Sequence, residues 1–324
     1  MSNFDIKKYS IIIPHHNIPK LLRRLLCSIP QREDIEVIVI DDNSDKEFLP
    51  DLYDLEKEYS NAQFVFLDKC RGGGGARNVG LEYAKGKWII FADSDDFFNY
   101  CINDILDEYK SCNADIIFFN ANSLYSNLYT TANRAKHLNY WIDNYNKTGN
   151  ELMLRYLFGE PWCKFVKRKI IFDNNIRFEE TTIHNDTAYS YLVGYYSKKM
   201  VVDSRALYCV TSRENSVSKG VSLEKKIERI GVFSRSSLFF KTHLIPIKEY
   251  RHFNQLLDLR LKNKKSYSQA IELMKKLGYT STNIKIGLVK QLIVRLTKIP
   301  IRLVVLILQK TCIHKQLFKL FIHI

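Results

Sequence analysis

Short apolar runs alternate with helix-like segments over the first 120 residues, and this alternation restricts the possible fold more than any other feature. The runs are apolar throughout rather than at every second position, which is typical of strands buried on both faces of a sheet. Between them, leucines and aromatic residues recur at helical spacing. This order predicts an α/β fold in which helices cover a parallel sheet. The runs are residues 9–13, 36–40, 64–67, 88–91 and 114–119.

Three aspartates follow the run 88–91 and form the first candidate site. Asp93, Asp95 and Asp96 repel one another, so they are tolerated only where water solvates them or a cation offsets their charge. Ligands usually bind at the carboxyl ends of strands in α/β sheets, and carboxylates there suit a divalent metal such as Mg²⁺ or Mn²⁺. The alternative is a solvated acidic turn.

A second polar cluster follows the run 36–40. Asp41 or Asp42 could accept a hydrogen bond from a nucleobase N–H or a ribose hydroxyl. The alternative is a turn that caps the next helix, because Asp, Asn and Ser are favoured at such positions.

A run of four glycines, residues 72–75, precedes Arg77 and Asn78. Glycines let the backbone approach a ligand closely, and a helix that begins there presents its N-terminus to an anion. The segment matches neither the dinucleotide fingerprint nor a P-loop. The alternative is a flexible connection, which leaves the Arg-Asn pair at the helix start unexplained.

The net charge of +14 is concentrated toward the C-terminus, where no acidic residue follows Glu272. A basic tail suits an anionic membrane or a nucleic acid, but no nucleic-acid-binding pattern accompanies it, so we expect no nucleic-acid partner. We expect residues 284–324 to form a basic amphipathic helix on a membrane surface; the alternative is a helix packed on the protein itself. No apolar run is long enough to predict a spanning helix.

Seven scattered cysteines show no paired spacing, and the N-terminus lacks a basic segment followed by an apolar one. These features predict reduced thiols in a cytoplasmic protein without a signal peptide. The polar, Asn-rich stretch 121–150 has no firm period and could be a loop, a lid or an insertion.

Four motifs in one order resemble family 2 of the inverting glycosyltransferases, whose fold is of the GT-A type. The resemblance is dense over residues 9–120 and implies a Rossmann-like, mostly parallel sheet flanked by helices. The residues from about 223 to 277 are helical in character and predict a helical extension at the C-terminal end. We therefore expect a nucleotide-sugar-binding half (1–120), an acceptor-binding and catalytic half (121–222), a helical extension (223–283) and the tail (284–324). The motifs are residues 11–17, 39–44, 74–81 and 84–96.

The resemblance also implies roles for single residues. Asp93, Asp95 and Asp96 resemble the metal-binding acidic motif, and His16 stands where many relatives carry an aromatic residue. The implied contacts to the donor nucleotide are Pro14, Asn17, Asp41, Asp42, Arg77, Asn78, Ser94 and Asp95.

In the second half, residues 184–189 resemble the segment that carries the catalytic base. Relatives usually have Glu-Asp there, whereas this chain has Asn185 and Asp186, so the base is placed at Asp186. Without the resemblance, Asp186 would be interpreted as a helix N-cap. The residues implied at the acceptor or the diphosphate are Trp162, Lys164, Glu180, Asn185, Arg213 and Ser216.

Together these motifs imply an inverting glycosyltransferase that moves a sugar from a UDP-linked donor to a hydroxyl of a glycan or lipid-linked oligosaccharide, in surface polysaccharide biosynthesis. Asp186 would be the general base, and Mn²⁺ or Mg²⁺ at the acidic motif would stabilise the leaving diphosphate. The enzyme would lie at the inner face of the bacterial cytoplasmic membrane. The alternatives are a nucleotidyltransferase on a similar fold, or a non-catalytic basic nucleic-acid-binding protein.

Overall fold

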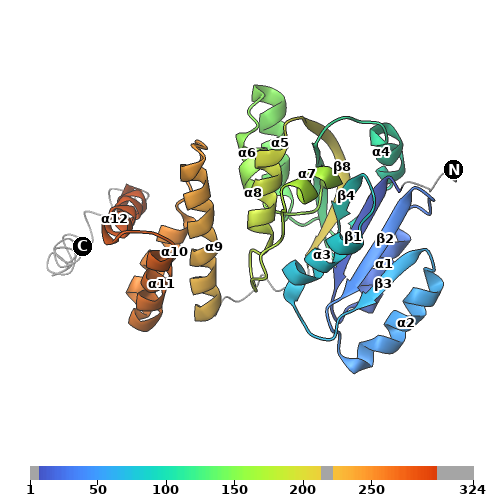
Figure 1. Ribbon diagram of the computed structural model, residues 1–324, viewed down its shortest axis with the longest axis horizontal. Coiled ribbons are helices and arrows are strands. Elements are labelled where there is room, and N and C mark those ends of the chain that lie inside the picture. The colour runs from blue at the N-terminus through green and yellow to red at the C-terminus, as the bar shows by residue number, and fades with distance from the viewer. Residues whose placement is uncertain (1–6, 213–221, 298–324) are drawn as a thin grey trace. The chain divides into compact units, whose positions relative to one another are not determined.

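The computed structural model describes residues 7–212 and 222–297, and its contacts divide the chain into two compact units, Met1–Lys219 and Gly220–Ile324. The first unit is built around an eight-stranded sheet, and the described part of the second unit is helical (Figure 1). The predicted α/β class with a C-terminal helical extension is therefore confirmed.

The sheet has the order β3-β2-β1-β4-β7-β6-β8-β5. Strands β1 to β4 are parallel, with Ile11 of β1 opposite Val37 of β2 on one side and Ile90 of β4 on the other. Beyond β4 the sheet is mixed, because β7 runs antiparallel between β4 and β6, while β6 and β8 are parallel. The strands are β1 (Tyr9–His15), β2 (Ile35–Asp41), β3 (Ala62–Phe66), β4 (Trp88–Phe91), β5 (Phe97–Phe98), β6 (Ile116–Tyr125), β7 (Lys164–Lys167) and β8 (Met200–Ser212).

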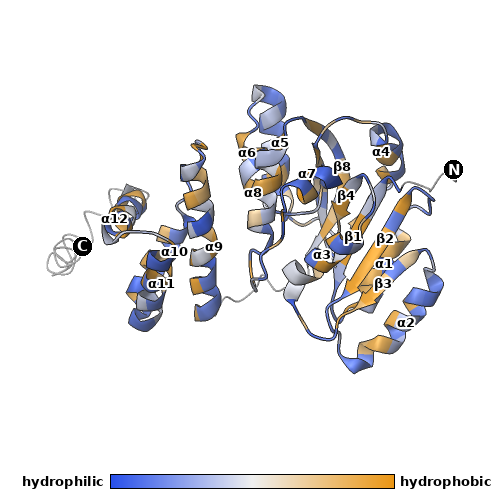
Figure 2. Cartoon of the chain, viewed as in Figure 1, coloured by the Kyte–Doolittle hydropathy of each residue, from blue (hydrophilic) through white to orange (hydrophobic). Residues whose placement is uncertain are grey.

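The position of β1 decides where a ligand can bind. β2 and β3 lie on one side of β1 and β4 lies on the other, so the direction of strand order reverses at β1. Doubly wound sheets open a crevice at the carboxyl ends of the strands at such a point. Figure 2 shows the strands around this point in the orange of apolar residues, as expected for strands covered on both faces.

Helices of the first unit bury their apolar faces against this sheet. Helix α3 packs on β1 and β2, and a Cβ added at Gly80 would lie 2.3 Å from Ile12 Cγ2, so this glycine permits the close approach. The helices are α1 (Pro19–Cys27), the 3₁₀ turn η1 (Lys46–Phe48), α2 (Leu49–Glu58), α3 (Gly72–Tyr83), α4 (Ile102–Tyr109), α5 (Lys136–Thr148), α6 (Leu152–Leu157), α7 (Arg168–Asp173) and α8 (Asp186–Tyr196).

The Asn-rich stretch 121–150 is more regular than its sequence indicates. It contains the end of β6 and helix α5, whose Leu138 and Ile142 are fully buried. Figure 1 shows α5 beside α6, and α6 in turn packs on α8. Residues 200–212 form the long strand β8.

The second unit has its own apolar core, to which Ile230, Leu256, Met274, Ile284 and Leu288 belong. The predicted helical region 223–277 is present and is divided into three helices, followed by a fourth. They are α9 (Leu223–Thr242), α10 (Arg251–Lys262), α11 (Lys264–Lys276) and α12 (Ser281–Thr297).

The predicted tail 284–324 lies only partly within the described residues. Its first part, up to residue 297, belongs to α12 and packs into the core of the second unit through Ile284 and Leu288, so this part follows the alternative of a helix packed on the protein. Residues 298–324 lie outside the described residues. Over residues 7–212 and 222–297, the structure contains no helix with the length and apolar character needed to cross a membrane.

Candidate active site

Four segments meet at the carboxyl ends of β1, β2 and β4. His15 at the end of β1 donates from Nδ1 to Asp41 at the end of β2, at 2.8 Å. The backbone N–H of Arg71, just before α3, donates to Asp42 at 2.7 Å. Arg77 on α3 donates to Asp93, after β4, at 2.6 Å. The predicted donor and metal motifs therefore lie side by side at one edge of the sheet.

Asp41 is buried, and its carboxylate accepts hydrogen bonds from the end of β1 and from the turn after β2. It accepts from His15, from Ser44 N–H at 2.9 Å and from Ser44 Oγ at 2.5 Å. Burial raises the pKa of Asp41, but the hydrogen bonds from His15 and Ser44 outweigh this effect and hold the pKa below its usual value. His15 Nε2 accepts the N–H of Ile18 at 3.1 Å, which requires the neutral ring protonated on Nδ1. These contacts give Asp41 a structural role.

Three other residues expected at the nucleotide, Asp42, Asn17 and Pro14, lie at or just after the ends of β1 and β2. Besides Arg71 N–H, Asp42 accepts from the Cys70 thiol at 3.1 Å. Asn17 has φ 57° and exchanges two hydrogen bonds with Asp45, at 2.7 and 2.8 Å. Pro14 lies in β1 opposite Ile40 and is half-buried. The structure thus builds one rigid rim from the turns after β1 and β2.

The backbone of the acidic motif is held by β8 and α1. The Tyr208 hydroxyl accepts Asp93 N–H at 2.8 Å, and Thr211 Oγ1 donates to the Asp95 carbonyl at 2.6 Å. Arg24 on α1 donates to the same carbonyl. Because three side chains from two elements fix this turn, its carboxylates are preorganised rather than loosely solvated.

The three carboxylates of the motif occupy different environments. Asp96 is 1% exposed and accepts Thr211 N–H at 2.7 Å, and burial, followed by the charges of Asp95 and Asp93, raises its pKa well above the usual value. Asp93 and Asp95 are half-buried, and Ser94 between them is buried. The aspartates at 93 and 95 therefore face a different environment from Asp96, which points into the protein.

No group of three His, Cys, Asp or Glu side chains is arranged to hold a metal within residues 7–212 and 222–297. Mg²⁺ and Mn²⁺ are commonly held by one or two carboxylates, with phosphate and water oxygens completing the shell. Asp93 and Asp95 supply oxygen donors of this kind, so the residues present fit such an ion bound together with a diphosphate.

Helix α3 holds the segment that leads into α8. A Cβ added at Gly74 would lie 2.2 Å from the Glu179 carbonyl oxygen and 2.9 Å from Asn185 Cβ. The amide of Asn78 donates to the Phe178 carbonyl at 3.0 Å and accepts Phe178 N–H at 2.8 Å. Asn78 is buried, and these two bonds anchor backbone rather than reach toward the sheet edge. The glycine run thus admits another segment of this chain, which the sequence did not indicate.

Arg77 links the acidic motif to the segment before α8. One terminal nitrogen donates to Asp93, and the other donates to Asn185 Oδ1 at 3.2 Å. Its guanidinium also lies over the Phe178 ring, 5.4 Å from the centroid. Arg77 Nε is buried and has no partner within the described part of the chain. A buried N–H without a partner is costly, so a ligand or a water that accepts from it would be favoured.

Asp186 is the first residue of α8 and is half-buried. Burial raises its pKa to about 6, against the opposing effect of the positive charge of Arg77; the nearby charges of Glu160 and Asp93 raise the pKa further. A carboxylate with a pKa near the working pH is suited to accept a proton and release it again.

Lys164 and Trp162, expected near the acceptor or the diphosphate, are both buried. Lys164 Nζ donates to the Phe158 carbonyl at 2.5 Å and to Ser190 Oγ at 3.2 Å, and burial lowers its pKa to about 7. The Trp162 ring stacks on Tyr208, with centroids 5.6 Å apart. Trp162 therefore packs against the tyrosine that holds the acidic motif, and Lys164 is bonded inside the protein.

Of the other residues expected at the acceptor or the diphosphate, two lie within the described residues and two do not. Glu180 pairs with Arg71, and Asn185 accepts from Arg77, so both lie where the segment before α8 meets α3. Arg213 and Ser216 lie outside the described residues.

Three residues of the site were missed by sequence reasoning: Arg24, Thr211 and Glu160. Arg24 and Thr211 hold the acidic motif, and the Glu160 carboxylate lies close enough to Asp186 to raise the pKa of Asp186. Glu160 also bonds His137 at 2.9 Å. Their only sequence signal was a polar side chain in or beside an apolar run, which cannot identify a partner more than 25 residues away.

Known proteins resemble this chain in sequence and in fold. The family model described as "Glycosyl transferase family 2" matches residues 10–173. The cholesterol galactosyltransferase of Borreliella burgdorferi is 24% identical over 277 residues, which cover 77% of this chain and 75% of the relative. The UDP-Glc:alpha-D-GlcNAc-diphosphoundecaprenol beta-1,3-glucosyltransferase WfaP of Escherichia coli is 31% identical over 124 residues, 37% of this chain and 45% of the relative. Other curated relatives are matched over as little as 15% of their length.

Solved structures give the same fold. S. aureus TarS 1–349 in complex with UDP-GlcNAc superposes with a TM-score of 0.58 at 20% identity, over 81% of this chain and 79% of that one. The mannosyltransferase PcManGT from Pyrobaculum calidifontis, in complex with GDP-Man and Mn²⁺, gives a TM-score of 0.51 at 13% identity, over 90% and 81% of the two chains. At these identities the likeness shows the fold alone.

Proposed function

The chain belongs to glycosyl transferase family 2 and is a glycosyltransferase, and we propose that it moves a sugar from a UDP-linked donor to a hydroxyl of a lipid-linked or polysaccharide acceptor, with inversion. One observation carries the proposal. Arg77 joins Asp93 of the acidic motif to Asn185, the residue before Asp186, so one side chain couples the proposed diphosphate site to the proposed base.

The donor would lie on the rim formed after β1 and β2. Asp42 accepts from the backbone of Arg71, so its carboxylate is held at the edge of the sheet where a nucleobase or ribose would meet it. The positive charge of Arg77 beside Asp93 and the start of α3 would favour the diphosphate. The nucleotide bound by TarS and the donor named for WfaP support UDP.

Asp93 and Asp95 would hold a divalent ion, and a bound Mg²⁺ or Mn²⁺ would stabilise negative charge on the leaving diphosphate. The manganese complex of the related mannosyltransferase supports this assignment. Asp96 would act differently, because its burial and its bond to Thr211 N–H suit a residue that shapes the turn. We therefore assign Asp96 a structural role instead of the ligand role expected from the sequence.

Asp186 would act as the general base. Its carboxylate takes the proton of the acceptor hydroxyl as the hydroxyl oxygen forms a bond to the anomeric carbon. The bond from that carbon to the diphosphate oxygen breaks at the same time, and UDP leaves with the bonding electrons. Attack opposite to the leaving group inverts the configuration. Arg77 fixes the position of the base relative to the diphosphate site. Its positive charge stabilises the negative charge that develops on the diphosphate.

The proposal as a whole is tested by screening a panel of nucleotide sugars with the purified full chain, with Mn²⁺, Mg²⁺ or EDTA present, and measuring nucleotide release. We expect release from a UDP-sugar, with dependence on the metal. Release from none of the panel with either metal would contradict the proposal.

Replacing Asp95 with asparagine should weaken metal-dependent UDP binding by about tenfold or more, because the ion loses one of its two proposed carboxylates. Calorimetry of UDP binding with Mn²⁺ and with EDTA measures the metal-dependent part. Asp54→Asn, an identical change at an exposed position of α2 paired with Lys57, is the control and should bind UDP normally. Unchanged affinity of the Asp95 variant in Mn²⁺ would remove Asp95 from the metal site.

The C-terminal end would dock on an anionic membrane, at the inner face of the cytoplasmic membrane. Ile286 and Ile293 of α12 are 49% and 52% exposed and are seven residues apart, on one face of the helix with Lys290. The sequence continues with basic and apolar residues to its end. An exposed apolar stripe beside basic residues is typical of interfacial helices.

Truncation after residue 297 should reduce co-sedimentation with phosphatidylglycerol vesicles several-fold, because it removes the basic segment 298–324 and keeps Ile284 and Leu288 in their core. The full chain on neutral phosphatidylcholine vesicles is the control and should sediment weakly. If both proteins sediment equally with anionic vesicles, the segment 298–324 does not dock.

A further inference from the structure

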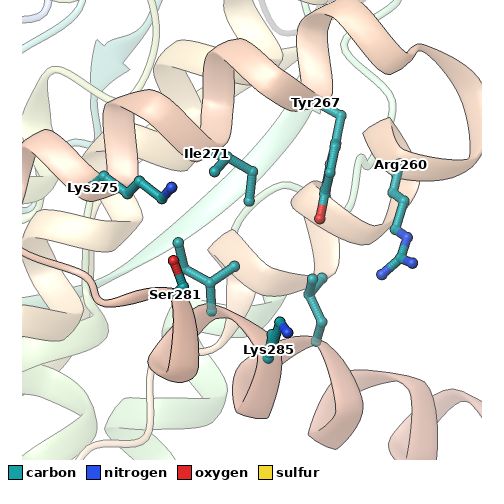
Figure 3. Close-up of a pocket in the computed structure, with 8 residues that line it drawn as sticks. Arg260, Tyr267, Ile271, Lys275, Ser281 and Lys285 are labelled. Carbon is teal, nitrogen blue, oxygen red and sulfur yellow. The ribbon is translucent and has the colours of Figure 1, made fainter. Parts of the chain in front are cut away.

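Helices α10, α11 and α12 of the second unit enclose a pocket of about 300 Å³ that takes no part in the proposed sugar transfer. Figure 3 shows the labelled side chains around a common space, with the Tyr267 ring extending into it from α11. The lining contains three basic residues, Arg260, Lys275 and Lys285, and no acidic residue. Each basic residue comes from a different helix, so the fold, and not a run in the sequence, brings these charges together.

The basic residues of the pocket differ from nearby basic residues, which form ion pairs with acidic side chains. Lys276, adjacent to Lys275, pairs with Glu272 at 2.9 Å, and Arg295, also on α12, pairs with Asp258 at 2.8 Å. Arg260, Lys275 and Lys285 have no acidic partner among the residues that the structure describes; Arg260 lies only over the Tyr267 ring, 6.0 Å from its centroid. Three unpaired cations around one cavity produce a positive potential that favours an anion.

The rest of the lining is apolar. Ile284 and Leu288 are almost fully buried and belong to the core of the unit, and Ile271 lies half-buried beside them. Ser281 and Tyr267 add hydroxyl groups, and Ser281 begins α12, whose N-terminus also favours negative charge. The pocket therefore offers cations and hydroxyls to one part of a ligand and an apolar wall to another.

We propose that this pocket binds the phosphate group of an amphiphile, a phosphate ester whose apolar chain lies against Ile271, Ile284 and Leu288. A lone inorganic anion would not use the apolar wall, and a neutral lipid would leave three cations unpaired. Two sources share this chemistry: an anionic phospholipid and a prenyl diphosphate of the kind that carries glycans. The site lies outside the proposed catalytic residues, so its ligand binding can be measured without sugar transfer.

The test uses the full chain and three soluble probes: dihexanoyl phosphatidylglycerol below its micelle concentration, farnesyl diphosphate, and inorganic phosphate. Calorimetry should show at least one amphiphile binding more than tenfold tighter than inorganic phosphate. The tighter amphiphile identifies the source. If inorganic phosphate binds as tightly as both amphiphiles, or if none of the probes binds, the proposal is overturned.

A matched pair of double variants separates the pocket from general surface charge. Lys275→Gln with Lys285→Gln removes two lysines of the pocket, and Lys276→Gln with Lys290→Gln removes two exposed lysines from the same two helices. The pocket variant should lose tenfold or more in affinity for the preferred amphiphile and the control less than about twofold. Equal losses would show diffuse attraction and overturn the proposal, as would no loss in either. UDP-sugar hydrolysis, measured on the same samples, should be unchanged in both and reports on the proposed function separately.

Discussion

Replacing Asp186 with asparagine should lower sugar transfer by about 10²–10⁴-fold while UDP binding stays intact, because the amide cannot take the proton of the acceptor hydroxyl. Asp186 is the first residue of α8, and none of the hydrogen bonds that tie the segment before it to α3 uses its side chain. The isosteric change should therefore leave the local structure in place. Transfer is measured as UDP release with acceptor present, and UDP affinity by calorimetry.

The pH profile of the same variant provides a second readout. Since the pKa of Asp186 is about 6, wild-type turnover should rise with pH through about 6 as the base ionises, and the variant should lose this limb. The raised pKa also means that the folded protein binds more protons than the unfolded chain between about pH 4 and 6. The contribution of Asp186 to the free energy of unfolding therefore falls as pH rises through that window. The variant should consequently be more stable than wild type at neutral pH.

Asp173→Asn is the matched control, since Asp173 is an exposed residue of α7 paired with Lys169. It should change neither turnover nor the pH profile. Full transfer activity in Asp186→Asn, or an unchanged rising limb, would exclude Asp186 as the base.

Replacing Gly74 with alanine should both destabilise the protein and reduce transfer by about 10²-fold. The new Cβ would lie 2.2 Å from the Glu179 carbonyl oxygen and 2.9 Å from Asn185 Cβ, closer than any real contact, so α3 and the segment before α8 must separate. Overpacking of this kind typically costs about 1–3 kcal/mol of unfolding free energy. A displacement of about 1 Å at a catalytic group can cost 10²-fold in rate.

Thermal unfolding and UDP release measure the two effects. Gly159→Ala is the control, because its Cβ would meet only the Leu157 carbonyl at 3.9 Å and φ there is not in the left-handed region. The control should behave as wild type in both assays. Wild-type activity of Gly74→Ala would show that the close approach of α3 does not position Asp186.

Much of the first unit could be predicted from sequence because its signals are local. The apolar runs at 36–40 and 88–91 became β2 and β4, and their order around β1 placed Asp42 and Asp95 at the same edge of the sheet. The family resemblance named these residues and Asp186, and the family model now supports the resemblance. The apolar character of a strand and the position of a motif after it are carried by neighbouring residues, which a single sequence displays.

The different contacts that neighbouring residues of one motif make could not be predicted. Asp41 and Asp42 are adjacent, yet they have different partners. His15 and Ser44 donate hydrogen bonds to Asp41, whereas the segment before α3 donates to Asp42. Likewise, Asp96 turns inward to Thr211, more than 100 residues away. Alternating side-chain direction at the end of a strand is local, but the partner that each side chain meets depends on the tertiary fold.

The order of apolar runs and acidic turns, by itself, determined the fold class, the ligand edge and the residue types available there, because backbone preference and burial act over short stretches of chain. Only the tertiary structure decided which of those residues are bonded to other parts of the chain, that residues 179–185 closely approach α3 at Gly74, and that Arg260, Lys275 and Lys285 surround one pocket. The physical reason is that hydrogen bonding, desolvation and charge act through space between groups whose separation along the chain carries no information about their distance.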